Sequence, residues 1–189
     1  MKVLFSKTDA LGDQLLATGT IAALLEQIPS AHVIWLVRSG YESIHTLLPG
    51  SQIWRPEMGR EPAQEAFRLC GMIQSVQSTP WSRVSFVPVT LNAYAPHPLG
   101  RDLRADTKWW MEFVGALGAN YGIACTPTLN WVDRALVAAS ASQVSVGYEA
   151  APLETMLPAG ILKLLEESHL SAEFTHTLRI DPGHHEGER

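Results

Sequence analysis

The chain has 189 residues, of which 46% are apolar and 17% charged, which is typical of a soluble globular domain with a sizeable core. A formal net charge of -5 argues against a general nucleic-acid binder, which needs a basic surface. No apolar run approaches the ~18 residues of a membrane-spanning helix, and the N-terminus lacks the layout of a signal peptide. Two cysteines provide neither a disulfide framework nor a metal site, so we expect a reduced, cytoplasmic setting.

The first half of the chain alternates short apolar runs with longer helical patterns. Strands are predicted over residues 2–6, 33–37, 52–54 and 84–89, with Pro88 at a strand end, and helices over 13–28, 41–48 and 61–77. The expected buried stripe of the first helix consists of Leu15, Leu16, Ala22, Ala23, Leu25 and Ile28. This alternation predicts an α/β fold of the Rossmann-like kind, a parallel sheet with helices on both faces.

The second half of the chain is less regular. The sequence predicts a loop over 91–103, a helix over 104–117 that Gly118 ends, irregular structure over 119–131, a helix over 133–141, a strand over 144–148 and a helix from 158 to 168. Trp109 and Trp110 are expected to pack, with at most one of them in the core. Residues 1–180 are thus predicted to form one domain, followed by a polar, disordered tail over 181–189.

The turn after the first strand is the most informative segment. Lys7 to Gly12 are polar or small, and a helix follows from Asp13. Ligands of parallel sheets bind at the carboxyl ends of the strands, so Asp9 and Asp13 are expected in such a crevice. A carboxylate there could take the proton of a hydroxyl group. The residues also allow that Asp13 merely caps the helix while Gly12 forms the turn, and that Asp9 only shapes that turn.

Other polar residues are predicted at the same edge of the sheet. Lys7 could bind a phosphate or carboxylate or be an ordinary solvated lysine, and Gly12 could let its amide face an anion. The absence of Gly-x-Gly-x-x-Gly disfavours a dinucleotide site. Arg55 and Arg60 follow the third strand and Asn92 the fourth. Guanidinium groups suit carboxylates and phosphates, although a solvated position is the simpler interpretation of each arginine.

The turn after the first strand reads Lys7-Thr8-Asp9-Ala10-Leu11-Gly12-Asp13. It is followed by a helix, by the HVIWLV run from His32 to Val37 and by Tyr41. This arrangement resembles the N-terminal half of the heptosyltransferases, glycosyltransferase family 9. The resemblance extends over roughly the first 55 residues. Members are inverting, GT-B-fold glycosyltransferases that move heptose from an ADP-sugar to the lipopolysaccharide inner core. Lys7 and Gly19 depart from the family, in which many members have arginine and proline at these positions.

The resemblance implies an acceptor-binding, N-terminal GT-B domain with Asp13 as the catalytic base. We expect acceptor contacts at the polar residues of the sheet edge described above, namely Lys7, Asp9, Gly12, Arg55, Arg60 and Asn92. The ADP-heptose donor would bind a second domain, for which the chain has no room and no Asp-x-Gly-x-x-His segment. The resemblance also implies metal-independent transfer without a cofactor, and we expect that this chain alone does not catalyse it.

The implied acceptor is a saccharide or glycolipid at the inner face of the cytoplasmic membrane, reached by at most a peripheral membrane contact. Two alternatives stay open. The chain could be a non-catalytic half-domain that binds a saccharide or a protein partner. It could also be an unrelated flavodoxin-like, nucleotide-binding domain.

Overall fold

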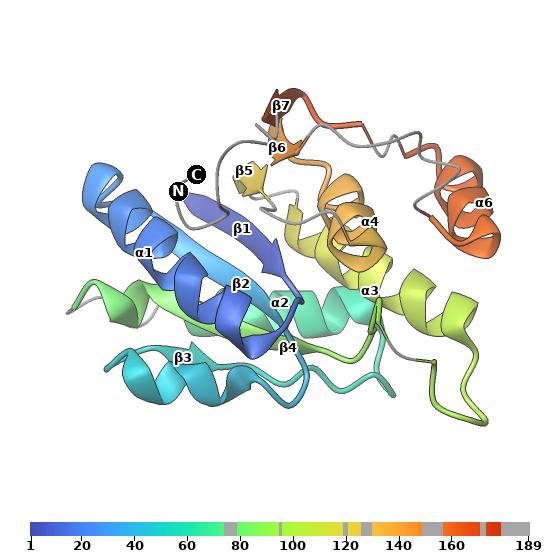
Figure 1. Ribbon diagram of the computed structural model, residues 1–189, viewed down its shortest axis with the longest axis horizontal. Helices are drawn as coiled ribbons and strands as arrows, with labels where there is room; N and C mark the ends of the chain where they lie inside the picture. The colour runs from blue at the N-terminus through green and yellow to red at the C-terminus, as the bar shows by residue number, and fades with distance from the viewer. Residues whose placement is uncertain are drawn as a thin grey trace.

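The computed structural model describes residues 1–73, 79–94, 96–118, 121–125, 130–148, 157–170 and 173–178. Within them lies a seven-stranded sheet in the order β3-β4-β2-β1-β5-β6-β7 (Figure 1). The strands are β1 Lys2–Lys7, β2 His32–Arg38, β3 Gln52–Ile53, β4 Val84–Val89, β5 Tyr121–Cys125, β6 Val144–Tyr148 and β7 His176–Leu178. All their pairings are parallel, which confirms the predicted fold class.

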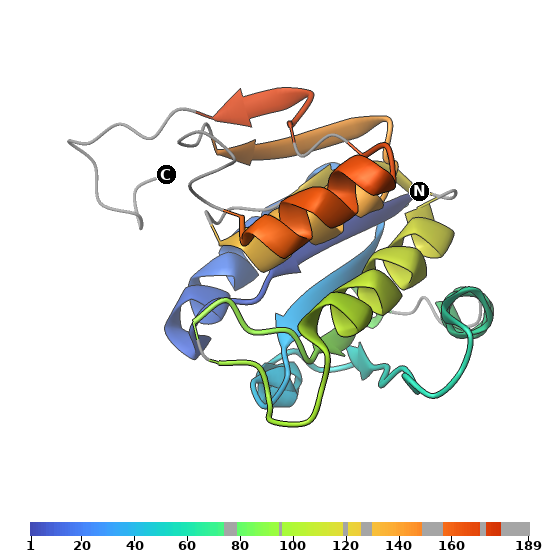
Figure 2. The same ribbon diagram turned by 90° about the vertical axis from the view of Figure 1, so that its right-hand side faces the viewer.

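Helices connect these strands and cover the sheet. They are α1 Leu11–Gln27, η1 Glu42–Leu47, α2 Pro62–Ile73, η2 Trp81–Arg83, α3 Leu103–Gly118, α4 Trp131–Ala139 and α6 Ala159–Glu167, where η denotes a 3-10 helix. α1 and η1 pack on one face of the sheet, and α2, α3 and α4 pack on the other. α6 packs outside α3 and α4 as a further layer, as Figure 2 shows.

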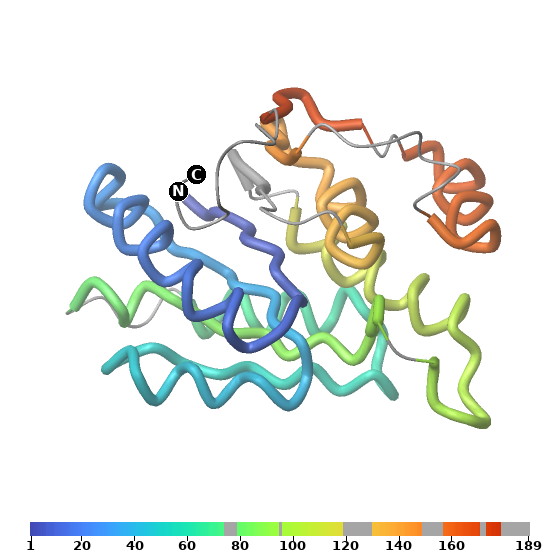
Figure 3. The backbone as a smooth tube through the Cα atoms, viewed as in Figure 1, coloured from blue at the N-terminus to red at the C-terminus, as the bar shows by residue number. Residues whose placement is uncertain are grey.

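The face of the sheet under α1 is built around three aromatic side chains. Phe5, Trp35 and Phe86 come from β1, β2 and β4, with ring centroids 5.4 Å and 5.0 Å apart along the row. All three are fully buried. Such edge-to-face and tilted contacts add to the area that the rings bury. They fix the register of the central strands, and so the position of the turn that follows β1. β1 itself runs into the middle of the molecule (Figure 3).

Pro88 lies inside β4 rather than at its end, opposite Val37 of β2. β3 pairs with β4 at Ser85 and Phe86. The short β3 therefore stops before it reaches Pro88. No residue of β3 is paired with Pro88, so the amide donor that the proline lacks is not required for the β3–β4 pairing.

The predicted buried stripe of α1 is right at Leu25, which is buried, and in part at Ile28, which packs against the same core, but wrong for its other residues. The buried residues are Gln14, Ala17, Ile21 and Leu25, whereas Leu15 and Leu16 are exposed. α1 has apolar residues around most of its circumference, so periodicity alone could not select the packed face. The small Ala17 and the polar Gln14 face inwards because the helix lies close to β1 and its following turn.

The prediction of irregular structure over 119–131 is also wrong, because β5 and the start of α4 lie within it. β7, a short and exposed edge strand, was not predicted. The expected tail over 181–189 lies outside the described residues. Over the part of the chain that is described, the helices are too short or too polar to cross a bilayer.

α3 ends at Gly118 as predicted, but for a different reason. The φ angle of Gly118 is not positive, so a left-handed backbone conformation does not explain why glycine is required here. A Cβ atom at residue 118 would lie 1.5 Å from the carbonyl oxygen of Ser140, directly after α4. The glycine thus permits α3 and the end of α4 to approach closely. The neighbouring tryptophans pack as expected: Trp110 is buried, and Trp109 stacks on Phe113.

Candidate functional site

The strand order places the candidate site between the ends of β1 and β5. From β1 the chain builds β2, β4 and β3 on one side, then returns to build β5, β6 and β7 on the other. In open parallel sheets, ligands bind at this reversal of strand order, outside the carboxyl ends of the strands. Both the loop after β1 and the residues that start α4 lie there.

The loop after β1 holds a buried ion pair. Lys7 Nζ lies 3.1 Å from Asp9 Oδ2, and the two side chains are only 10% and 9% exposed. Lys7 is therefore not the solvated lysine that the sequence also allowed. Its charge is matched by Asp9 within the loop, so the two residues that sequence analysis assigned to the acceptor form one unit.

Asp133, in the first turn of α4, holds this loop from the opposite side of the reversal point. Its carboxylate accepts a hydrogen bond from the Ser6 hydroxyl at 2.6 Å. It also accepts a hydrogen bond from the Thr8 amide, whose nitrogen lies 3.1 Å from Oδ1 and 2.9 Å from Oδ2. Asp133 is fully buried and so satisfies a backbone donor that water does not reach.

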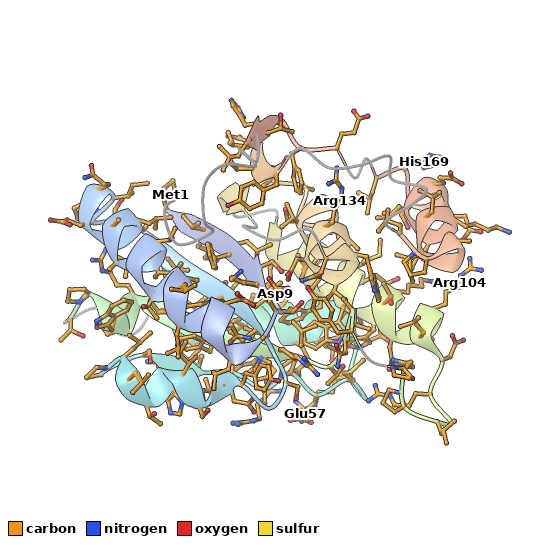
Figure 4. All side chains as sticks on the ribbon, in the orientation of Figure 1. Met1, Asp9, Glu57, Arg104, Arg134 and His169 are labelled. Carbon is orange, nitrogen blue, oxygen red and sulfur yellow. The ribbon has the colours of Figure 1, made fainter. Side chains whose placement is uncertain are left out.

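Asn130 joins the two buried carboxylates. As the N-cap residue of α4, it accepts a hydrogen bond from the Asp133 amide through Oδ1 at 2.9 Å. Its Nδ2 donates to Asp133 Oδ2 at 2.5 Å and to Asp9 Oδ1 at 2.8 Å. A single amide side chain therefore starts α4 and also fixes that helix against the loop after β1. Figure 4 shows Asp9 at the end of β1, in the middle of the molecule.

The environment of Asp133 disfavours its charge. The pKa of its carboxyl is raised to about 6, chiefly because burial removes it from water and also because the Asp9 carboxylate is near. The hydrogen bonds from Ser6, Thr8 and Asn130 act in the opposite direction. The hydrogen bonds that Asp133 accepts from Ser6 and Thr8 make it a positioning group for the loop, and the neighbouring Asp9 is paired with Lys7.

Tyr94, in the loop after β4, reaches the Asp9 carboxylate. Its hydroxyl donates to Asp9 Oδ1 at 2.6 Å, although the residue is 63% exposed. Asn92, which sequence analysis proposed as a substrate contact, accepts the Tyr94 amide through Oδ1 at 2.9 Å. That oxygen of Asn92 shapes the turn that brings Tyr94 over the loop after β1.

Asp13 and Gly12 lie in the first turn of α1. The N-cap residue of α1 is Ala10, so Asp13 does not cap the helix, and Gly12 lies within the helix rather than in the turn before it. The Asp13 side chain is half-buried, and within the described part of the chain it forms no hydrogen bond or ion pair. A Cβ atom on Gly12 would meet nothing within 4 Å, so the space beside it is open.

Gln14 connects α1 to the same loop. Its Nε2 donates to the Asp9 carbonyl at 3.1 Å, and its buried Oε1 has no hydrogen-bond partner among the described residues. The start of α1, and with it Asp13, is therefore tied to the backbone of Asp9.

Arg55 and Arg60 lie after β3 and are partly exposed. Arg55 pairs with Glu42 at 2.9 Å, and Arg60 pairs with Glu57 at 2.9 Å. No interaction among the described residues joins either arginine to Asp9. The structure thus brings Lys7, Asp9 and Asn92 into one network with Tyr94 and leaves the arginines on a neighbouring surface.

Asn130, Asp133 and Tyr94 were not predicted as site residues from the sequence. One signal was present, since asparagine followed by aspartate three residues later is an N-cap pattern that would have started α4 earlier. Nothing local in the sequence indicates that these residues face Asp9. Over the described ranges, no three His, Cys, Asp or Glu side chains gather as a metal site would require.

Comparisons with known proteins bear on the fold. No protein-family model matches the chain, and neither does any curated protein. The solved structure of E. coli heptosyltransferase WaaC with ADP-2-deoxy-2-fluoro heptose matches 100% of this chain, with a TM-score of 0.53 and 20% identity. A glycosyl transferase family 9 protein from Veillonella parvula matches 95% of the chain at 12% identity, with a TM-score of 0.47.

The chain spans 45% of the length of each of these two proteins. At 20% identity, the likeness to the heptosyltransferase establishes shared architecture. It agrees with the resemblance in the N-terminal sequence, which rests on different observations. The chain has the fold of slightly less than half of a heptosyltransferase.

Proposed function

We propose that this chain is the acceptor-binding half of a glycosyltransferase of the heptosyltransferase type. The main support is that the whole chain matches the heptosyltransferase fold and that Asp13 stands beside the reversal point of the sheet. The donor in this proposal is ADP-heptose or a related nucleotide-sugar. The acceptor is a saccharide or glycolipid of the lipopolysaccharide inner core.

Inverting transfer requires a base at the acceptor hydroxyl. The hydroxyl oxygen forms a bond to the anomeric carbon while the bond from that carbon to the diphosphate breaks, and the hydroxyl proton passes to the base. We assign this role to Asp13, a half-buried carboxylate that no neighbour among the described residues engages. The fixed position of this carboxylate in the first turn of α1 supplies much of the effect in this proposal.

The charges near the loop after β1 favour a hydroxyl ligand over a phosphate. Lys7 is already paired with Asp9 at 3.1 Å, and Asp13 adds a second carboxylate in the first turn of α1. Phosphate would be repelled there, which disfavours a flavodoxin-like or dinucleotide-binding role. Carboxylates are good acceptors of hydrogen bonds from sugar hydroxyl groups. In this proposal the diphosphate of the donor binds a second domain.

Arg55 and Arg60 are suited to the anionic groups of an inner-core acceptor. Their shortest glutamate pairs, with Glu42 and Glu57, are partly exposed, and such pairs contribute little stability; the buried Glu65, 3.7 Å from Arg60, is held at 2.6 Å by Arg68. A guanidinium can therefore exchange its glutamate for a phosphate or carboxylate of the acceptor at low cost. We assign these two residues to the periphery of the acceptor site.

The assay that tests this proposal is heptose transfer from ADP-heptose by the natural protein that carries this sequence, with Asp13→Asn as the variant. We expect turnover to fall roughly 10²-fold or more, since a positioned base is lost, while binding of a lipid-free inner-core oligosaccharide changes little. Glu26→Gln, an exposed carboxylate at the far end of α1, is the matched control and should transfer normally.

Three outcomes would contradict parts of the proposal. If Asp13→Asn keeps full turnover while Asp9→Asn loses it, the base is Asp9. If the oligosaccharide binds but transfer is absent even with ADP-heptose, the chain is a non-catalytic binding half. If calorimetry of residues 1–189 shows micromolar binding of ADP-heptose, the donor does not need a second domain.

A further inference from the structure

The Asp9 carboxylate receives hydrogen bonds from two kinds of donor. Lys7 and Asn130 approach it at 3.1 Å and 2.8 Å, and both residues are buried. Tyr94 approaches at 2.6 Å from an exposed loop. The first two donors belong to the framework that holds the loop after β1. The third comes from the surface, which is the direction from which a ligand would arrive.

Tyr94 is unusual for an exposed tyrosine. Its side chain could place the hydroxyl in water at no cost, yet the hydroxyl is turned towards a carboxylate that is only 9% exposed. An O–H donor at 2.6 Å from a carboxylate is a charge-assisted hydrogen bond. Because the residue is 63% exposed, its displacement would uncover little apolar surface.

We propose that the Tyr94 hydroxyl occupies the position of a saccharide hydroxyl, so that Asp9 binds a hydroxyl of the acceptor and Tyr94 competes with the acceptor for it. This inference rests on the proposed function and adds to it an internal competitor for Asp9, which is one of the acceptor contacts expected from the sequence. The ligand class follows from the chemistry, because an alcohol offers the same O–H donor as the phenol of Tyr94.

The exchange also provides selectivity. One O–H···O hydrogen bond is broken and one of the same kind is formed, so a single sugar hydroxyl gains little over the tyrosine. A ligand displaces Tyr94 only if its other groups find partners as well, for instance at Asp13. A simple alcohol or a monosaccharide therefore competes poorly, whereas an oligosaccharide that fills several positions competes well.

The experiment compares Tyr94→Phe with the wild-type chain by calorimetry, with a lipid-free lipopolysaccharide inner-core oligosaccharide as the probe. Removing the hydroxyl removes the competitor and keeps the ring. In this variant Asp9 keeps its hydrogen bonds from Lys7 and Asn130 but no longer accepts one from residue 94, so the Kd should fall about 3- to 10-fold. Asp9→Asn should weaken binding roughly tenfold, since an amide is a poorer acceptor than a carboxylate. Tyr148→Phe, a half-buried tyrosine in β6, is the matched control.

The sign of the change separates this inference from a structural role. A tyrosine that merely stabilises the loop would lower the Tm on conversion to phenylalanine and would leave the Kd unchanged or raise it. That result overturns the inference, while the observed binding still supports the proposed function. Binding that is detected with Tyr94→Phe but not with wild type supports the inference. Binding to neither protein at millimolar oligosaccharide overturns the inference and the proposed acceptor together.

Discussion

Replacement of Asp133 should separate the support of the candidate site from its chemistry. Asp133→Ala leaves the Thr8 amide, the Ser6 hydroxyl and one hydrogen of Asn130 without their acceptor in a buried place. Each such group costs about 1–3 kcal/mol, and the hydroxyl can rotate to other partners, so we expect a loss of about 3–5 kcal/mol in the free energy of unfolding. Asp133→Asn keeps one acceptor oxygen and should lose less.

The pH dependence provides an independent check. The pKa of Asp133 is raised from 3.8 to about 6 in the folded chain, so between these values the folded state binds more protons than the unfolded state. The stability contributed by Asp133 is therefore fully present below pH 3.8 and is lost as the pH rises through about 6. At about 1.4 kcal/mol for each tenfold change in the acid constant, this loss is about 3 kcal/mol. Asparagine does not titrate, so Asp133→Asn should be costlier at pH 4 than at pH 7.5.

The assay is urea unfolding at both pH values, followed by the fluorescence of the buried tryptophans. Asp102→Asn is the control, since Asp102 is an exposed carboxylate whose side-chain oxygen accepts the Arg104 amide at the start of α3. It should change stability by no more than about 0.5 kcal/mol. A loss below about 1 kcal/mol for Asp133→Ala would refute the argument that this residue holds the loop. An equal effect of Asp133→Asn at the two pH values would refute the assigned titration.

Two further predictions concern the framework. Gly118→Ala should cost about 3 kcal/mol or more in urea unfolding, because its Cβ would lie 1.5 Å from the Ser140 carbonyl oxygen. Gly71→Ala, in open space on α2, should instead gain up to about 1 kcal/mol, and equal effects of the two would contradict the close approach. Burial, and then the nearby charges of Lys2 and Arg83, lower the pKa of His32 from 6.5 to about 4. The stability contributed by neutral His32 is therefore present above pH 6.5 and is lost as the pH falls towards 4. His32→Gln should remove about 3 kcal/mol of that pH dependence in the same assay, and an unchanged pH profile would contradict it.

Much of the sheet could be predicted because its inner strands are continuous apolar runs. β2 and β4 are buried on both faces, and such strands are recognisable without alternation. β5 could not be recognised, because Tyr121–Cys125 is short and contains a glycine. The packed face of α1 could not be selected either, since Leu15 and Leu16 are as apolar as the residues that do pack.

The location of the candidate site was predictable, but its construction was not. Strand, turn and helix at the N-terminus indicated that Asp9 and Asp13 lie at the carboxyl edge of the sheet. Two partners of Asp9, Tyr94 and Asn130, lie 85 and 121 residues away in the sequence, and no local pattern connects them to it. The assignment of Lys7 to the acceptor considered charge alone, whereas in the structure Asp9 takes up that charge.

The bond between Thr8 and Asp133 has a consequence for how the molecule folds. It joins residues 125 positions apart in the sequence. The second edge of β1 is likewise covered only when β5 pairs with it. A nascent chain that ends after β4 therefore exposes an apolar strand edge, which can pair with other chains. Contacts between distant residues also form slowly. The same late step closes that edge and assembles the site, so a molecule able to bind its ligand has already passed the stage at which it is most prone to aggregate.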